Sequence, residues 1–399
     1  MSASRRFVLA TLLSIGSASP IHASSDASAS FRTIVLPVDG DPDAIAVADV
    51  NEDGAPDMIL ANPQAGTVSI MLGDRKGHFR KSPGSPFSAG HLPNDLGIGD
   101  FNGDGHLDLL IVDTQSPFVT LLLGDGHGGF HPAQDSPFMT NAKPHPHGVA
   151  VGRFCGQAQP LDAVIDSWGS AEIELLLNDG RGTLRNGPRF PAGPGSDMPL
   201  RSADLNQDGI ADVVMPDTAI GQWNSNAVSV LLGDGKCGFK AAPGSPLNGG
   251  SVPWSVAIGD VDSDGIPDLL LVPYGPRVQD PKKIAASVLL GDGQGGFHPM
   301  PGSPFALPGC ANPRRIAVGS VLGNGTHDFA VTCMNSEKVL LFHSEKGKNL
   351  EVSSLDTPSG APSAPPGRGV LLADLRAQGR DDIIVSNGTA GTVTLLLSK

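Results

Sequence analysis

Apolar residues along the chain form short runs separated by turns that are rich in glycine, aspartate and proline. Near the start, residues 44–48 alternate small and apolar side chains, and apolar runs follow at 58–61 and 67–72. A further segment begins at Phe79 after a glycine-containing turn. Short β-branched and leucine-rich runs between such turns are typical of β-hairpins, and outside the N-terminus no stretch has the 3.6-residue apolar period of a helix. The pattern therefore predicts a unit of four short strands.

This unit repeats along the sequence. An aspartate-rich string of nine residues follows the first predicted strand, and its four intact copies begin at Asp49, Asp100, Asp204 and Asp260. The first two copies are 51 residues apart, and the last two are 56 residues apart. Degenerate copies at 151–162, 319–328 and 374–382 complete seven units. A period of roughly 50 to 60 residues indicates a solenoid, an array or a propeller, and we expect an all-β, seven-bladed β-propeller with four-stranded antiparallel blades.

The two ends of the chain predict how the ring closes. The last unit ends at residues 395–399, after its third strand. Residues 31–36 resemble the fourth strands that begin at Phe79, Phe130, Phe239 and Phe297. We therefore expect 31–36 to pair with 392–397 as the outer strand of the last blade, so that main-chain hydrogen bonds seal the ring. Residues 31–399 then form one propeller.

The repeated string has the composition of a calcium loop. Oxygen-bearing side chains occupy positions 1, 3, 5 and 9, a backbone carbonyl is available at position 7, and glycine at position 6 permits a sharp turn. The candidate ligands are Asp49, Asn51, Asp53, Ala55 and Asp57; Asp100, Asn102, Asp104, His106 and Asp108; Asp204, Asn206, Asp208, Ile210 and Asp212; and Asp260, Asp262, Asp264, Ile266 and Asp268. The alternative is that these strings are solvated Asp/Gly turns without a metal.

These motifs, together with the Leu-Gly-Asp-Gly-x-Gly-Gly-Phe hairpins at 123–130 and 290–297, resemble the FG-GAP/VCBS repeats found in the propeller heads of integrin alpha chains. The resemblance covers about residues 31–399 and implies calcium in the loop between strands 1 and 2, on the lower face of the disc. Three units depart from the pattern, with Arg153, Cys155 and Gln157, with Ser320 and Leu322, and with Arg376 and Gln378 at ligand positions. We therefore expect about four structural Ca²⁺ ions and none in those three units.

The charge of the chain agrees with metal loops. The intact strings contain 13 aspartates, and the formal net charge is −14. Clustered carboxylates repel one another unless a cation lies among them. The acidity therefore belongs mostly to the loops, and it argues against nucleic acid binding.

The N-terminus resembles a secretory signal. Arg5 and Arg6 precede the apolar run 7–15, and Ala23 offers a small residue for cleavage, so we expect a signal peptide over 1–23 and a flexible linker over 24–30. Residues 4–9 also approach a twin-arginine signal, although paired arginines are common in ordinary signals. No later run reaches transmembrane length. The expected product is a secreted or periplasmic monomer without a transmembrane segment.

The four cysteines fit an oxidising compartment. Cys310 precedes the first strand of the sixth unit and Cys333 ends its second strand, so we expect a Cys310–Cys333 disulfide. Cys155 and Cys237 fall in lower-face loops of adjacent blades, where we expect free thiols or small residues that fill space.

The upper face, opposite the acidic loops, carries varied side chains. The residue six positions before each loop is, in order, Asp43, Asn94, His147, Met198, Trp254, Arg314 and Arg368, and proline precedes five of them. Trp168, Trp223 and Tyr274 fall in the loops between strands 2 and 3 of three neighbouring units. Amphipathic rings suit stacking on sugars or peptide groups. The candidate ligand-binding residues are His147, Trp168, Trp223, Trp254, Tyr274, Arg277, Arg314 and Arg368; alternatively, the rings only pack down long loops.

Motifs of enzyme chemistry are scarce. The chain has no His-Glu-x-x-His, no Gly-x-Ser-x-Gly and no phosphate-binding loop, and its G-x-G-x-x-G strings at 124–129 and 291–296 lie between strands. Two hypotheses remain. The first is a secreted, non-catalytic binding or adhesion module for an extracellular glycan or protein. The second is a carbohydrate-active enzyme, such as a polysaccharide lyase, or a lectin on the same scaffold.

Overall fold

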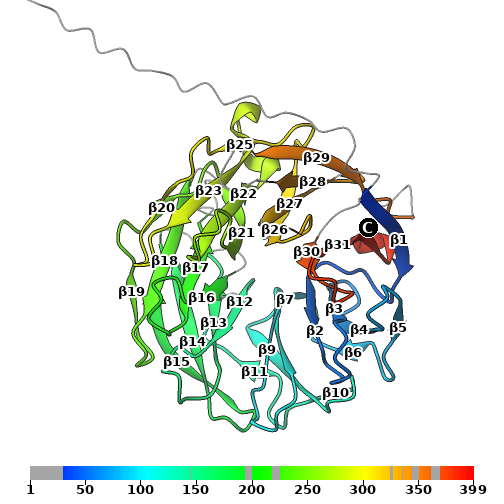
Figure 1. Ribbon diagram of the computed structural model, residues 1–399. Helices are drawn as coiled ribbons and strands as arrows, with labels where there is room; N and C mark the ends of the chain where they lie inside the picture. The colour runs from blue at the N-terminus through cyan, green and yellow to red at the C-terminus, as the bar shows by residue number, and fades with distance from the viewer. Residues whose placement is uncertain are drawn as a thin grey trace, which may run out of the picture.

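The computed structural model describes residues 30–143, 145–193, 200–217, 225–323, 327–334, 336–343, 350–360 and 369–399. The expected signal peptide, nearly all of the expected linker, Trp223 and Arg368 lie outside this set. The described residues form antiparallel sheets arranged as the seven blades of a ring (Figure 1). Their helical structure consists of short 3₁₀ turns, namely η2 (Gly275–Arg277), η3 (Pro281–Lys283) and η4 (Gly388–Ala390). The all-β, seven-bladed prediction is confirmed.

Blades 1 to 4 follow one another along the chain. Blade 1 consists of β2 (Ile45–Ala48), β3 (Asp57–Asn62), β4 (Thr67–Gly73), β5 (Phe79–Lys81) and β6 (Phe87–Ser88). Blade 2 consists of β7 (Pro93–Gly99), β8 (Asp108–Asp113), β9 (Phe118–Gly124), β10 (Phe130–Pro132) and β11 (Phe138–Met139). Blade 3 consists of β12 (Val149–Gly152), β13 (Asp162–Ser167), β14 (Glu172–Asn178) and β15 (Leu184–Pro191). Blade 4 consists of β16 (Arg201–Ala203), β17 (Asp212–Pro216), β18 (Ala227–Gly233), β19 (Phe239–Ala241) and β20 (Leu247–Asn248).

Blades 5 to 7 complete the ring. Blade 5 consists of β21 (Pro253–Gly259), β22 (Asp268–Pro273), β23 (Ala285–Gly291), β24 (Phe297–Pro299) and β25 (Phe305–Ala306). Blade 6 consists of β26 (Pro313–Gly319), β27 (Asp328–Cys333), β28 (Lys338–His343) and β29 (Glu351–Asp356). Blade 7 consists of β30 (Val370–Ala373), β31 (Asp382–Ser386), β32 (Thr392–Ser398) and β1 (Phe31–Pro37). Figure 1 shows the first strand of each blade near the middle of the ring.

In four blades the fourth strand is broken into two short pieces, which the repeat pattern alone did not predict. In blade 1, β5 and β6 both pair with β4. Between them, the hydroxyl of Ser85 accepts a hydrogen bond from the backbone N–H of Ile70 at 2.9 Å. A serine before proline thus replaces the missing strand partner. The same contact joins Ser136 to Leu121, Ser245 to Val230 and Ser303 to Val288.

The ring closes through the N-terminal strand, as predicted. β1 pairs antiparallel with β32, in a register that runs from Phe31 opposite Ser398 to Pro37 opposite Thr392. The backbone N–H of Lys399 extends this pairing to the carbonyl of Ser30 at 2.8 Å. Figure 1 shows β1 at the outer edge of the last blade, beside the C-terminus.

The hydrophobic core lies between the blades. Seven buried clusters occur among the described residues, one at each junction of neighbouring blades. At the closing junction, Met58 and Leu60 of blade 1 share a cluster with Val393 and Leu395 of blade 7. Each blade is therefore apolar on both faces of its middle strands, and no blade can bury its core without its two neighbours.

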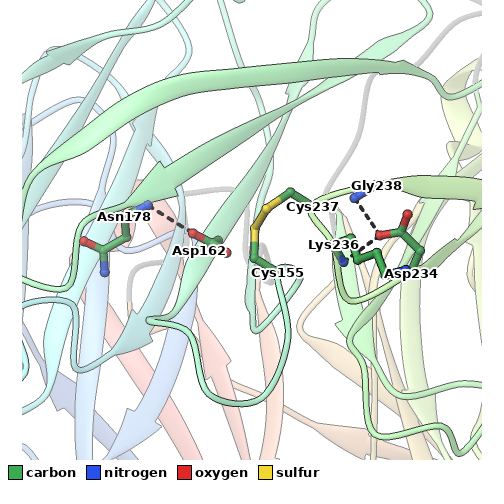
Figure 2. Close-up of a disulfide and its surroundings, with 7 residues drawn as sticks. All are labelled: Cys155, Asp162, Asn178, Asp234, Lys236, Cys237 and Gly238. Atoms are coloured by element: carbon green, nitrogen blue, oxygen red, sulfur yellow. Dashed lines mark hydrogen bonds between the residues drawn. A yellow bond between two sulfur atoms is a disulfide. The ribbon is translucent and has the colours of Figure 1, made fainter.

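All four cysteines are paired. Cys310 and Cys333 form the expected disulfide, with Cα atoms 5.5 Å apart. The expectation that Cys155 and Cys237 stay free or only fill space is wrong, because a disulfide joins them across blades 3 and 4 (Figure 2).

The reason for this second disulfide is a recurring contact between blades. The turn after the third strand of one blade donates a backbone N–H to the carbonyl at position 2 of the preceding blade's loop. These bonds run from Gly128 to Val50, from Gly182 to Phe101 and from Cys237 to Phe154, at 3.1, 3.1 and 3.3 Å. The contact brings the Cα atoms of Cys155 and Cys237 to 4.2 Å, within reach of a disulfide.

Deleting residues 31–37 should lower the melting temperature by more than about 5 °C, since the deletion exposes the edge of β32 and opens two junction cores. Calorimetry of the deletion protein beside a control that lacks only 24–29 measures the effect. Equal melting of the two proteins would show that β1 does not hold the ring.

Candidate functional site

The four acidic strings form tight loops between the first and second strands of blades 1, 2, 4 and 5. In blade 1, the carboxylate of Asp49 accepts hydrogen bonds from the backbone N–H groups of Asp53 and Gly54, at 3.1 and 2.7 Å. The same pair of bonds recurs at Asp204 and Asp260. The first carboxylate of each string therefore wraps the loop around itself.

Glycine at position 6 is required by the backbone conformation. The φ angles of Gly54, Gly105, Gly209 and Gly265 are +81°, +92°, +83° and +85°. A Cβ atom at Gly105 or Gly265 would meet no atom within 4 Å. The left-handed backbone, and not a lack of space, therefore selects glycine at these positions.

The aspartate at position 9 is the most buried acidic group of each loop. Asp57 is fully buried; its Oδ2 accepts the N–H of Val50 at 3.0 Å, and its Oδ1 accepts the N–H of Gly73 at 2.8 Å. It thus ties the loop to the end of the third strand. Burial, opposed by these bonds and reinforced by the charges of Asp53 and Asp49, raises its pKa from 3.8 to about 6. The pKa values of Asp108, Asp212 and Asp268 are raised to about 6 in the same way.

The donor set fits a hard divalent cation. In blade 5, carboxylate oxygens of Asp260, Asp262 and Asp268 lie within 4.8 Å of one another. Burial, followed by the charge of Asp264, raises the pKa of Asp262. Oxygen-only donors at this spacing suit Ca²⁺, and a bound cation supplies the counter-charge that the buried carboxylates need.

Blade 7 places an arginine at a position where the intact loops have a candidate metal ligand. Arg376, at position 3, donates from Nε to Oδ2 of Asp382 at 3.0 Å and from Nη2 to Oδ1 at 2.7 Å. Asp374 still accepts the N–H groups of Gln378 and Gly379, so the loop keeps its shape. The guanidinium provides the position-9 carboxylate with a cation from the chain itself.

The other two degenerate loops also have partners for this carboxylate. In blade 6, Nδ1 of His343 lies 2.5 Å from Oδ1 of Asp328. In blade 3, Asp162 accepts the N–H of Asn178 at 3.0 Å beside the Cys155–Cys237 disulfide (Figure 2). The position-9 aspartate therefore holds the loop in all seven blades, whereas the acidic ligand positions are complete in four.

The opposite ends of the first strands carry the varied residues. β7, β21 and β26 each begin at a proline followed by an irregular register, next to Asn94, Trp254 and the pair Arg314–Arg315. Proline has no N–H to donate to the sheet, and such bulges re-aim side chains at sheet ends. The proline at the start of each of these strands therefore explains why the side chains after it depart from the regular alternation of a strand.

Two clusters of candidate ligand residues form at this face. Trp254 stacks on Tyr274 with ring centroids 4.3 Å apart, and the guanidinium carbon of Arg314 lies 5.0 Å from the Trp254 ring centroid. In the second cluster, the rings of His147 and Trp168 are 4.1 Å apart. Both tryptophans are partly exposed, and both pack against neighbouring side chains, as the loop-packing alternative expects. Arg277 is exposed on η2.

The His147 ring is held in a buried environment. Its Nδ1 lies 3.9 Å from Oδ2 of Asp166, which is fully buried and accepts the N–H groups of His147 and Gly148. Burial, followed by the charge of His145, lowers the pKa of His147 to about 3. Burial raises the pKa of Asp166 to about 7. His147 is therefore neutral at physiological pH.

Sequence reasoning missed several charged residues of this face. Asp95 and Arg315 directly follow the positions that were singled out, and Arg201 begins β16. One residue per unit was singled out by its distance from the loop, so the neighbouring residue of each consecutive pair was not considered. The proline before each pair was the available signal, because it marks the bulge that turns both side chains.

A sequence profile described as an FG-GAP-like repeat matches residues 49–111 and 215–271, which include three of the four intact loops. No curated protein sequence matches the chain. Among solved structures, the chain is similar to one in the crystal structure of BBS1N in complex with ARL6DN, soaked with lead, with a TM-score of 0.56 and 12% identity over 92% of this chain and 98% of that one. It is also similar to the exotype rhamnogalacturonan lyase YesX, with a TM-score of 0.52 and 12% identity over 92% of this chain and 76% of the lyase.

Both likenesses concern the fold alone at this identity. In the part of the chain that the structure describes, no helix has the length and apolar character needed to cross a bilayer.

Calcium removal should destabilise the ring. We expect about four calcium ions per chain by elemental analysis, because the fifth position of the nine-residue string is an aspartate in four loops. Asp53→Ala, Asp104→Ala, Asp208→Ala and Asp264→Ala should each remove about one ion, whereas Gln378→Ala in blade 7 is the matched control and should remove none. Protein without bound calcium, melting identically with and without chelator, would refute the metal assignment.

The pH dependence supplies a further check on the same assignment. Without calcium, the folded-state pKa of about 6 at the four position-9 aspartates lies above the ordinary 3.8. The folded state then binds more protons than the unfolded state between these values, so the stability of chelated protein should fall as pH rises from about 4 to about 6. Added calcium should abolish that loss by favouring the ionised carboxylates.

Arg376→Ala should destabilise the protein by about 3 kcal/mol, because it leaves the fully buried Asp382 without its cation. Arg376→Lys should recover only part of this loss, since an ammonium cannot form the two-pronged bond. The double variant Arg376→Asn with Gln378→Asp recreates an intact string and should bind one additional calcium ion per chain. Denaturant unfolding and metal analysis measure both effects, and wild-type stability of Arg376→Ala would contradict the role of the guanidinium.

Proposed function

On the premise that FG-GAP-like repeats build this seven-bladed propeller, we propose that the protein is an exported, calcium-binding, non-catalytic binding or adhesion module. Its ligand binds at the face opposite the calcium loops. The proposal rests on the difference between the two ends of the first strand in each blade. In blade 5, β21 runs from Trp254 beside the aromatic cluster to the acidic loop that begins at Asp260. One end of the strand serves the scaffold, and the other end presents varied groups.

Export is supported by two features. The two disulfides suit an oxidising compartment, and the residues before the propeller have the pattern of a signal peptide. Loops with three or four carboxylates bind calcium at the concentrations found outside cells. Calcium would then be a constant structural partner of the exported protein.

The partner is an extracellular glycan or protein, bound by a monomer. Similar propellers occur in the BBS1N–ARL6DN protein complex and in a lyase that acts on rhamnogalacturonan. The net charge of −14 opposes binding of nucleic acid. A glycan is favoured by Trp254, Tyr274 and Arg314, because aromatic rings next to a guanidinium suit the apolar faces and polar groups of sugars.

The second candidate is a carbohydrate-active enzyme or lectin on the same face. It is favoured by the His147–Asp166 contact, which places a neutral imidazole beside a carboxyl whose pKa is about 7. A group whose pKa lies near neutral pH, as that of Asp166 does, is suited to proton transfer. A lyase would need this pair to reach a bound polysaccharide.

A glycan array in calcium buffer, run beside a cleavage assay on uronate polysaccharides, separates the two candidates. Binding without cleavage, weakened at least about tenfold by Trp254→Ala through loss of the aromatic surface, is the expected result. Cleavage that is lost in His147→Ala or Arg277→Ala would favour the enzyme. Arg80→Ala, an exposed change on β5, is the control. Binding that resists every change at the upper face would refute the proposed location.

A further inference from the structure

Charged side chains from four blades meet at the centre of the upper face. Nη1 of Arg201 in blade 4 donates to Oδ2 of Asp95 in blade 2 at 3.1 Å, across the intervening blade 3. Nη2 of Arg314 in blade 6 lies 4.0 Å from Oδ2 of Asp43, which precedes β2 of blade 1. Arg315 is close enough to all four groups for each to shift its pKa. The first strands bring these side chains together around the ring axis.

The backbone of β26 holds the two consecutive arginines in place. The register of β26 against β27 is irregular between Pro313 and Ile316, so both side chains leave the strand alternation there. The N–H of Arg315 donates to Oγ1 of Thr332 at 3.3 Å, and Thr332 is fully buried. Both arginines are half-buried, and only 17% of the Arg314 side chain is exposed.

The described cluster has more cationic groups than carboxylates. It contains the guanidinium groups of Arg201, Arg314 and Arg315 and the largely buried carboxylates of Asp43 and Asp95. Asp95 is already engaged by Arg201 and accepts the N–H of Val149 at 3.4 Å. These five side chains together therefore carry one net positive charge.

Two donors of this cluster are buried without an acceptor. Within the described part of the chain, Nη1 of Arg315 and Nε of Arg314 are inaccessible and have no hydrogen-bond partner. A buried charged donor without an acceptor is costly. Burial, followed by the charge of Arg314, lowers the pKa of Arg315 to about 10, which still leaves it protonated at neutral pH.

We propose that Arg314 and Arg315 form an oxyanion site for an acidic sugar residue of the ligand, with Trp254 and Tyr274 beside it. This inference deepens the proposed function and rests on it. Guanidinium groups match the planar oxygens of a carboxylate and also bind sulfate esters. The stacked pair Trp254–Tyr274 adjoins Arg314, so an anionic group at the arginines places its sugar ring next to the aromatic surface. The carboxylates of Asp43 and Asp95 offset two of the three guanidinium charges. The charge that is left suits a single anionic group.

Calorimetric titration tests the site with three probes of equal length: oligogalacturonate, a neutral galactan oligosaccharide and a sulfated galactan oligosaccharide. All titrations contain calcium. Oligogalacturonate or the sulfated probe should bind at least about tenfold more tightly than the neutral probe, which corresponds to one charge-assisted pairing. Preference between the two acidic probes identifies the oxyanion as carboxylate or sulfate ester.

Arg314→Gln and Arg315→Gln should each reduce binding of the preferred acidic probe at least about tenfold and leave binding of the neutral probe unchanged. Arg80→Gln on the outer strand β5 is the matched control and should change neither. Melting temperature and calcium content of each variant verify folding. Arg315→Lys should retain part of the affinity because it keeps the charge.

The outcomes separate this site from the broader proposal. Equal binding of acidic and neutral probes, with both lost in Trp254→Ala, would overturn the oxyanion site and leave the glycan-binding face intact. Binding that is insensitive to Trp254, Arg314 and Arg315 would overturn both. No binding of any glycan, with an acidic peptide bound in an Arg315-dependent manner, would overturn the acidic-sugar ligand in favour of a protein partner.

Discussion

The buried aspartate at the start of each second strand is the constraint on which the rest of this propeller depends. Its two oxygens accept N–H groups from the loop before it and from the end of the third strand, as Asp57 does with Val50 and Gly73. A carboxylate in that position needs a compensating positive group. The lower face can be understood as different solutions to this one electrostatic requirement. In blade 7 Arg376 supplies a cation, in blade 6 a ring nitrogen of His343 lies 2.5 Å from the carboxylate, and in the four intact loops the oxygen-bearing side chains suit calcium.

Stabilisation at the lower face leaves the upper face free to vary. The loop, the hairpin of the next blade and the junction core hold each first strand at its lower end, as the bond from Gly128 to Val50 illustrates. The upper end of the same strand carries a proline and an irregular register in three blades. Side chains there can change without disturbing the sheet, since they take no part in the strand pairing. This separation leaves a regular scaffold free to carry different side chains at its upper face.

The contacts between blades also explain the disulfide that joins blades 3 and 4. Cys155 and Cys237 are 82 residues apart, yet they lie at a loop-to-hairpin contact of the kind that also joins blade 1 to blade 2 and blade 2 to blade 3. The disulfide is anchored in the degenerate loop of blade 3, which lacks the acidic side chains of the intact loops. This covalent bond joins two elements that the backbone has already brought within a few ångströms.

Sequence alone determined the four-stranded unit, the number of blades and the closing strand. The four strands of the first unit lie within one residue of the apolar runs that predicted them, because strand and turn preferences are local. The acidic strings and their left-handed glycines were equally visible, since each loop is built from nine consecutive residues. Metal binding, export and the ligand remain predictions from those patterns.

Only the tertiary structure decided which distant residues meet. Arg201 and Asp95 are 106 positions apart, and their contact crosses a whole blade. The pairing of Cys155 with Cys237 and the second arginine at the ring centre depend in the same way on the curvature of the ring and on bulges at the strand ends. A repeat pattern specifies each blade, but the distance between side chains of different blades follows from how seven twisted sheets pack around one axis. For this reason the scaffold could be predicted from the sequence, and the composition of the central site could not.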